Sequence, residues 1–130
     1  MTDQPAAAID VAALTELMKA TGDDAGIMRR LIDVYLADAP RQIQQIRDGI
    51  SERDMERVNR GAHSLKSTSG TMGAMRLAQM SRELEAMTAP AIAEAGNLDD
   101  AGIATKSAAL AAELESVRQE LDAFVPAAQP

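Results

Sequence analysis

The only histidine of the chain, His63, lies in the segment Ala62–Gly73, where helical spacing directs its ring toward solvent among small side chains. An imidazole in water titrates near neutral pH, so an exposed one offers an uncharged nitrogen that can carry a group covalently. Side chains on a helix lean toward its N-terminus, so the residue four positions further along covers this ring. That residue is Ser67, which is short enough to leave the imidazole accessible.

Gly70 lies one turn beyond Ser67 and, having no side chain, leaves the surface around the imidazole more accessible. A glycine inside a helix costs about 1 kcal/mol relative to alanine, so its presence favours close approach by another molecule. The alternative is a helix that ends at Gly70. With Asn59 on the same side of the helix, we predict that Asn59, Ser67 and Gly70 form a partner-docking surface around His63.

Two cations flank the histidine on the expected helix, Lys66 at i+3 and Arg60 at i−3. They suit an anionic group, and phosphate is the anion that we expect, with Lys66 stabilising it. A neutral imidazole attacks best when its second nitrogen donates to an acceptor. Glu83 and Glu85 follow the next turn at about the height of the histidine, and spacing does not choose between them. Taken alone, Lys66 is more typical of a solvated surface lysine, and the two glutamates could equally be exposed helix charges.

The elements that position these residues are predicted to be helices. The chain has one Tyr, one Phe and no Trp, and helix-forming residues dominate, so we predict an all-α protein. A short helix is expected from Asp10 to Thr21. A second begins at Asp23 or Asp24, and Pro40 is expected to bend it or divide it in two.

Capping residues, glycine and proline predict the remaining helices: one begins at Ser51 and ends at Gly73, one ends before Pro90, and one is capped by Asn97 or Asp99. Residues 88–97 have no clear pattern. The buried face of the helix that carries the histidine is predicted from helical spacing to comprise Val58, Ala62, Leu65, Ser69 and Met72.

Four long amphipathic helices with short connections predict an antiparallel up-down-up-down four-helix bundle, with the short N-terminal helix as a lid. The predicted domain covers residues 9–125, between a flexible N-terminus at 1–8 and a disordered tail at 126–130.

Charge and composition exclude several classes of function. The net charge of −7 argues against nucleic-acid binding, and the absence of cysteine together with a single histidine argues against the common metal centres. No run approaches the ~20 apolar residues of a membrane span. We therefore expect a soluble, cytoplasmic, monomeric protein without a cofactor or a metal, and with no nucleic-acid or membrane partner.

The run Ala62–Ala74, followed by Leu77 and by the segment Arg82–Glu85, resembles the histidine-containing phosphotransfer (HPt) domain of bacterial phosphorelays. The resemblance implies that His63 takes a phosphoryl group from an aspartyl phosphate or a kinase and passes it to the aspartate of a receiver domain. It implies that Lys66 stabilises that group and favours Glu85 over Glu83 as the residue that orients the ring.

The position four residues after the histidine is commonly glycine in that family and is Ser67 here. We expect this difference to affect which receivers dock rather than whether transfer occurs.

The sequence thus predicts a phosphorelay intermediate that exchanges its phosphoryl group with response-regulator receiver domains or a hybrid histidine kinase. We expect a covalent carrier and not an enzyme, with Mg²⁺ in the partner's active site. The alternatives are a helical adaptor in which His63 is incidental and a phosphotransfer domain derived from a larger sensor kinase. A hydrolase that uses two of Glu56, Glu83 and Glu85 ranks last, because a helical bundle offers no concave pocket.

Overall fold

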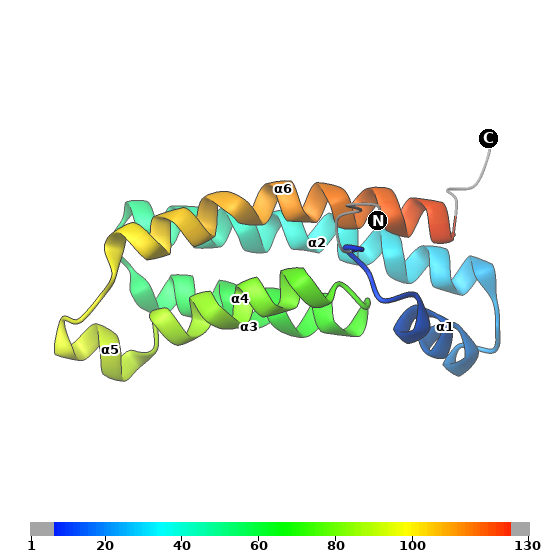
Figure 1. The fold of residues 1–130 in the computed structure, drawn as a ribbon, viewed down its shortest axis with the longest axis horizontal. Coiled ribbons are helices and arrows are strands. Elements are labelled where there is room, and N and C mark those ends of the chain that lie inside the picture. The colour runs from blue at the N-terminus through cyan, green and yellow to red at the C-terminus, as the bar shows by residue number, and fades with distance from the viewer. Residues whose placement is uncertain (1–6, 126–130) are drawn as a thin grey trace, which may run out of the picture.

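The computed structural model describes residues 7–125, in which it contains helices and turns but no strand. The helices of this part of the chain are α1 (Val11–Ala20), α2 (Ala25–Ser51), α3 (Met55–Thr71), α4 (Met75–Met87), α5 (Pro90–Ala95) and α6 (Asp100–Phe124). The predicted all-α class is confirmed. Figure 1 shows α2, α3, α4 and α6 along the length of the molecule, with α1 near one end and α5 at the other.

The two chain ends bear on the predicted domain boundaries. Residues 1–6 and 126–130, most of the predicted N-terminal segment and the whole predicted tail, lie outside the described residues. Ala8, which the sequence analysis grouped with the N-terminal segment, is buried, and its N–H donates to Glu120 Oε2 at 2.8 Å. The N–H of Ile9 donates to the other oxygen of the same carboxylate at 3.0 Å. The packed part of the chain therefore includes Ala8.

Aspartate side chains cap four of the helices. Asp10 caps α1 by accepting from backbone N–H groups, as predicted. Of the two candidates predicted at each of the other helix starts, Asp24 caps α2 and Asp99 caps α6. The predicted cap at Ser51 is wrong. Ser51 is the last residue of α2, and Asp54 instead caps α3 by accepting from the N–H of the third residue after it. The reason is that α2 continues beyond its apolar stripe, so the turn and the cap move toward the C-terminus.

Two features of the chain that involve proline differ from what the sequence suggested. Pro40 does not divide α2, which is one continuous helix. This proline is exposed, while Ala39 and Ile43 on the adjacent face of the helix are buried, so their packing in the core holds the helix together despite one lost backbone hydrogen bond. The segment without a clear pattern contains the short helix α5, which begins with Pro90, a residue well suited to the first helical position.

The core lies between the four long helices and includes the predicted buried face of α3. Fully buried large side chains come from every long helix and from α1, and they include Leu14, Met28, Ile32, Ile46, Leu65, Leu77, Leu84, Ile103, Leu110 and Leu121. One polar pair crosses this core: the hydroxyls of Tyr35 on α2 and Ser69 on α3 are 2.8 Å apart. Burial raises the pKa of Tyr35 to about 12, so this pair is a neutral hydrogen bond at physiological pH.

The helices α2 and α3 approach each other closely at two glycines. A Cβ atom on Gly61 would lie 2.9 Å from Cγ1 of Ile46 and 3.3 Å from the carbonyl oxygen of Gln42. A Cβ atom on Gly49 would lie 2.7 Å from Cγ2 of Val58. Both distances to carbon are too short for real contacts, so a larger residue at either position would force a neighbouring side chain or the helices themselves to shift. This packing fixes the helix that carries His63.

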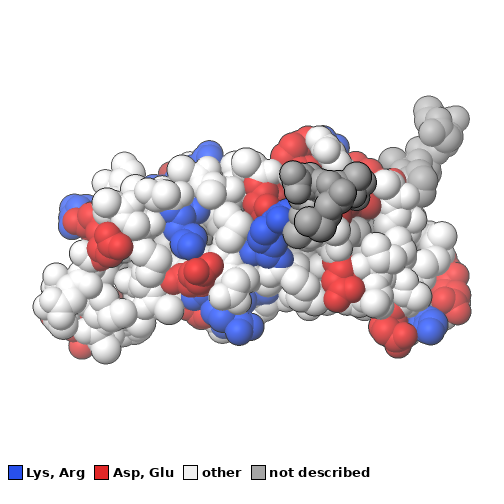
Figure 2. Space-filling view, viewed as in Figure 1, with Lys and Arg blue, Asp and Glu red and all other residues white. Residues whose placement is uncertain are grey.

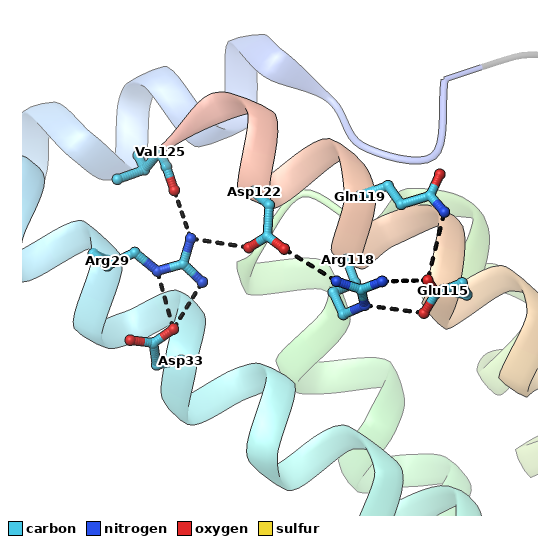
Figure 3. A network of polar contacts seen from close by, with 7 residues as sticks. All are labelled: Arg29, Asp33, Glu115, Arg118, Gln119, Asp122 and Val125. Atoms are coloured by element: carbon cyan, nitrogen blue, oxygen red, sulfur yellow. Dashed lines mark hydrogen bonds and ion pairs between the residues drawn. The ribbon is translucent and has the colours of Figure 1, made fainter. Parts of the chain in front are cut away.

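An ionic network ties the start of α2 to the end of α6 (Figure 3). The guanidinium of Arg29 is only 11% exposed and donates to Asp33 at 2.7 Å, to Asp122 at 3.0 Å and to the carbonyl oxygen of Val125 at 2.5 Å. Asp122 also pairs with Arg118, at 3.3 Å. The network closes the bundle at the end that holds α1, away from α5 (Figure 1).

Candidate functional site

His63 lies on α3, and its side chain is 61% exposed. Its Nδ1 atom is 2.5 Å from Oε2 of Glu85, which projects from the last turn of α4. Glu83 lies elsewhere and pairs with Lys106 on α6, at 3.3 Å. The structure therefore brings Glu85, and not Glu83, to the imidazole.

Lys66 completes a group of three charged or ionisable side chains. Its Nζ atom donates to Oε1 of Glu85 at 2.7 Å, so the carboxylate bridges Lys66 and His63. The hydrogen bond from Lys66 is the main reason that the pKa of Glu85 lies below its usual range, and the hydrogen bond with His63 lowers it further, while partial burial opposes both. Glu85 is therefore ionised at neutral pH and can only accept hydrogen bonds.

This arrangement decides the protonation of the neutral imidazole. Because an ionised carboxylate can only accept, Nδ1 of His63 must carry the proton and donate it to Glu85. The lone pair of the neutral ring is then on Nε2. The site consequently offers one nucleophilic nitrogen, a fixed ring orientation and a nearby ammonium group, which together suit covalent capture of an anionic group.

Of the other residues that the sequence singled out, some lie at the surface around His63 and others do not join the site. Ser67 is exposed, and a Cβ atom at Gly70 would meet nothing within 4 Å, so the surface beyond the imidazole is open. The alternative that the helix ends at Gly70 is wrong, because α3 continues to Thr71. Arg60 pairs with Glu56 at 3.0 Å and does not join the group around the histidine.

Asn59 has a different environment from the one that the sequence suggested. We expected it on the docking surface, but its side chain is half-buried and its Nδ2 atom donates to the backbone carbonyl of Glu85 at 2.8 Å. A second, longer contact of 3.4 Å joins the same atom to Oγ1 of Thr88. Thr88 is buried and was missed by sequence reasoning, since a single threonine at a helix end carries no pattern that marks it.

The described part of the chain contains no group of three His, Cys, Asp or Glu side chains that could hold a metal ion. None of its helices is long and apolar enough to cross a membrane. On the face shown in Figure 2, acidic and basic side chains are interspersed along the molecule, and the end that holds α5 is largely uncharged. The basic side chains on that face do not form a continuous patch.

Comparison with known proteins identifies the family. A family model described as the Hpt domain matches residues 30–124, a range that contains the histidine and both of its charged neighbours. The chain belongs to the Hpt domain family. This Hpt protein is therefore a histidine phosphotransfer intermediate of a phosphorelay, and Hpt proteins are phosphocarriers that interact with receiver domains and kinases.

A solved structure supports the fold. The crystal structure of histidine-containing phosphotransfer protein B (HptB) from Pseudomonas aeruginosa PAO1 is similar to this Hpt protein, with a TM-score of 0.61 and 23% sequence identity. The match covers 89% of this chain and 98% of that chain. No curated protein sequence matches significantly.

Proposed function

We propose that His63 is the phosphoryl acceptor of this Hpt protein, that Lys66 stabilises the bound phosphoryl group and that Glu85 orients the imidazole. The observation that carries the proposal is the bridging carboxylate: Glu85 contacts Nδ1 of His63 at 2.5 Å and Nζ of Lys66 at 2.7 Å. The chain has no other histidine, so a histidine phosphocarrier has no other acceptor of this kind.

The transfer step uses the lone pair on Nε2. This nitrogen attacks the phosphorus of a receiver's aspartyl phosphate, an N–P bond forms, the P–O bond to the aspartate breaks, and the aspartate leaves as a carboxylate. The ring gains positive charge because Nδ1 keeps its proton, and the negative charge of Glu85 stabilises that developing charge. The ammonium of Lys66 offsets the negative charge of the transferred phosphoryl oxygens. The reverse step returns the group to an aspartate by the same path.

The protein is proposed to be a carrier rather than a complete enzyme. The residues around His63 supply a nucleophile, an orienting acid and one cation, and we propose that the partner supplies the remaining machinery, including Mg²⁺. We further propose a cytoplasmic monomer that needs no cofactor of its own, and that binds neither nucleic acid nor membrane.

We also propose that the four long helices form an antiparallel up-down-up-down bundle with α1 as its lid. The neighbours in space support this: α2 packs on α3 and α6, and α4 packs on the same two helices. The backbone N–H of Asp10, just before α1, donates to the carbonyl oxygen of Gly73 at 2.7 Å, which holds α1 against the turn between α3 and α4.

The experiment that tests the function is phosphoryl transfer from purified receiver domains labelled with radioactive acetyl phosphate. Label should appear on the protein, be lost in acid and survive alkali, as a phosphoramidate does, and map to His63. His63→Gln should abolish labelling while the helical circular-dichroism signal is unchanged. Label on another residue, or none with any of a broad panel of receivers, would contradict the proposal.

A further inference from the structure

Asn59 is placed to hold the acidic partner of the histidine rather than to meet another protein. Its amide nitrogen donates to the backbone carbonyl of Glu85 at 2.8 Å and contacts Oγ1 of Thr88 at 3.4 Å. Thr88 in turn donates to the carbonyl of Leu84 at 2.9 Å. One side chain of α3 is thereby joined to the last turn of α4.

The last turn of a helix has carbonyl groups without partners inside the helix, so it frays unless other donors satisfy them. At the end of α4 the available backbone bonds are long: the N–H of Thr88 lies 3.2 Å from the carbonyl oxygen of Leu84 and 3.3 Å from that of Glu85. The Glu85 carbonyl also accepts from Oγ1 of Thr88 at 3.3 Å, so the bond of 2.8 Å from Asn59 is the shortest of the three. The Glu85 carbonyl is therefore held most closely from α3, whereas the Leu84 carbonyl is held by Thr88 itself.

Three residues of α3 are spaced so that all of them face Glu85. Asn59, His63 and Lys66 are at positions i, i+4 and i+7, which place them on one face of the helix over two turns. All three contact the same residue of α4: Asn59 binds the backbone of Glu85, and the other two bind its carboxylate. Glu85 is fixed at both its backbone and its carboxylate by a single helical face.

We infer that Asn59 is a positioning residue for phosphoryl transfer, which acts by holding the backbone of Glu85 so that the carboxylate stays on Nδ1 of His63. This inference rests on the proposed role of His63. It also replaces the prediction from the sequence that Asn59 belongs to the docking surface, and the two roles have different kinetic consequences.

Asn59→Leu tests the inference, because leucine keeps the branched shape and adds no charge but cannot donate. With phosphorylated receiver domain at saturating concentration, the transfer rate should fall about fivefold, the rate equivalent of the ~1 kcal/mol of one hydrogen bond. The receiver concentration that gives half the maximal rate should stay within twofold of wild type. Asn59→Ala should give the same pattern, and Glu56→Leu, one turn earlier and exposed, is the matched control that should change neither value.

A second readout does not depend on phosphorylation. Because the chain has a single histidine, ring ¹⁵N-labelled histidine reports on this site alone. The Nδ1-protonated share of the neutral ring should fall in both Asn59 variants. A shift without any transfer by the wild-type protein would support the positioning role and contradict the proposed function.

A wild-type tautomer ratio in both variants would overturn the inference. So would an unchanged maximal rate with weaker half-saturation, the result expected of a docking contact.

Discussion

Replacing Glu85 with glutamine removes one negative charge and turns one of its two acceptor oxygens into an NH2 group, so Lys66 loses its acceptor when the remaining oxygen stays on His63. Glutamine has nearly the same shape as glutamate and keeps an oxygen that can accept from Nδ1 of His63. The variant therefore separates the charge of Glu85 from its ability to orient the ring. We expect it to slow phosphoryl transfer without weakening receiver docking.

The size of the effect follows from the geometry. Two unit charges about 4 Å apart attract by about 1 kcal/mol in water and by about 4 kcal/mol at an effective dielectric constant of ~20 near a protein surface. The imidazole of His63 is 61% exposed and Glu85 is 22% exposed, so solvent screens the pair and the lower half of that range applies. A loss of about 1–2 kcal/mol of stabilisation of the charged ring corresponds to a rate about 5–30-fold lower.

The assay is single-turnover transfer from a radiolabelled receiver, measured by rapid quench at several receiver concentrations. Glu83→Gln is the matched control. It removes the same charge from a residue two positions away, whose carboxylate pairs with Lys106 and not with His63. Transfer by Glu85→Gln within twofold of wild type would refute the reasoning, as would an equal loss in both variants.

Three further outcomes are expected. Lys66→Ala should slow transfer about tenfold, equivalent to ~1.4 kcal/mol of phosphoryl stabilisation, with only a small fall in the thermal midpoint because a partly exposed ion pair adds little stability. Time courses of labelling and circular dichroism measure the two effects. Tyr35→Phe should lower the free energy of unfolding by about 1–2 kcal/mol in urea titrations, because the buried hydroxyl of Ser69 loses its partner. The pKa of Glu85 is lowered in the folded protein, mainly by Lys66. The ionised Glu85 carboxylate therefore stabilises the fold fully above the unfolded pKa of ~4.3, and this stabilisation is lost as the pH falls through the lower folded pKa. Urea midpoints should consequently fall more steeply below about pH 4 for wild type than for Glu85→Gln.

Most of the helical framework could be predicted from the sequence because apolar residues recur at helical spacing and aspartates mark helix starts. The buried face of the histidine-bearing helix is an example: the five predicted residues are all buried, four of them in α3 and the fifth directly after it. They are Val58, Ala62, Leu65, Ser69 and Met72. The start of α3 was misplaced because Ser51 and Asp54 can both cap a helix, and only the length of α2 decides between them.

The acidic partner of the histidine could not be found from spacing. Glu83 and Glu85 are two residues apart on α4, so their side chains differ by about 200° around the helix axis and only one can face α3. Which one does so depends on the rotation of α4 against its neighbours, which is a property of the packed helices. The resemblance to a family, and not the periodicity, favoured Glu85.

Asn59 illustrates a different limit. Helical spacing classes each position as buried or exposed, and a polar residue on the outer side of a helix is then assigned to solvent. The amide of Asn59 lies at the border between α3 and α4, where polar groups bind the ends of the adjacent helix. Such contacts join residues 26 positions apart and leave no local trace in the sequence.

The close packing at Gly49 and Gly61 has a thermodynamic consequence for docking. Binding is weakened by every loop or side chain that must lose freedom when two proteins associate. Here the helix that presents His63 is already seated against α2, with Gly61 only two positions before the nucleophile. The backbone of this helix consequently needs little further ordering when a receiver docks. Differences in affinity among receivers should therefore reflect how far each must rigidify its own loops.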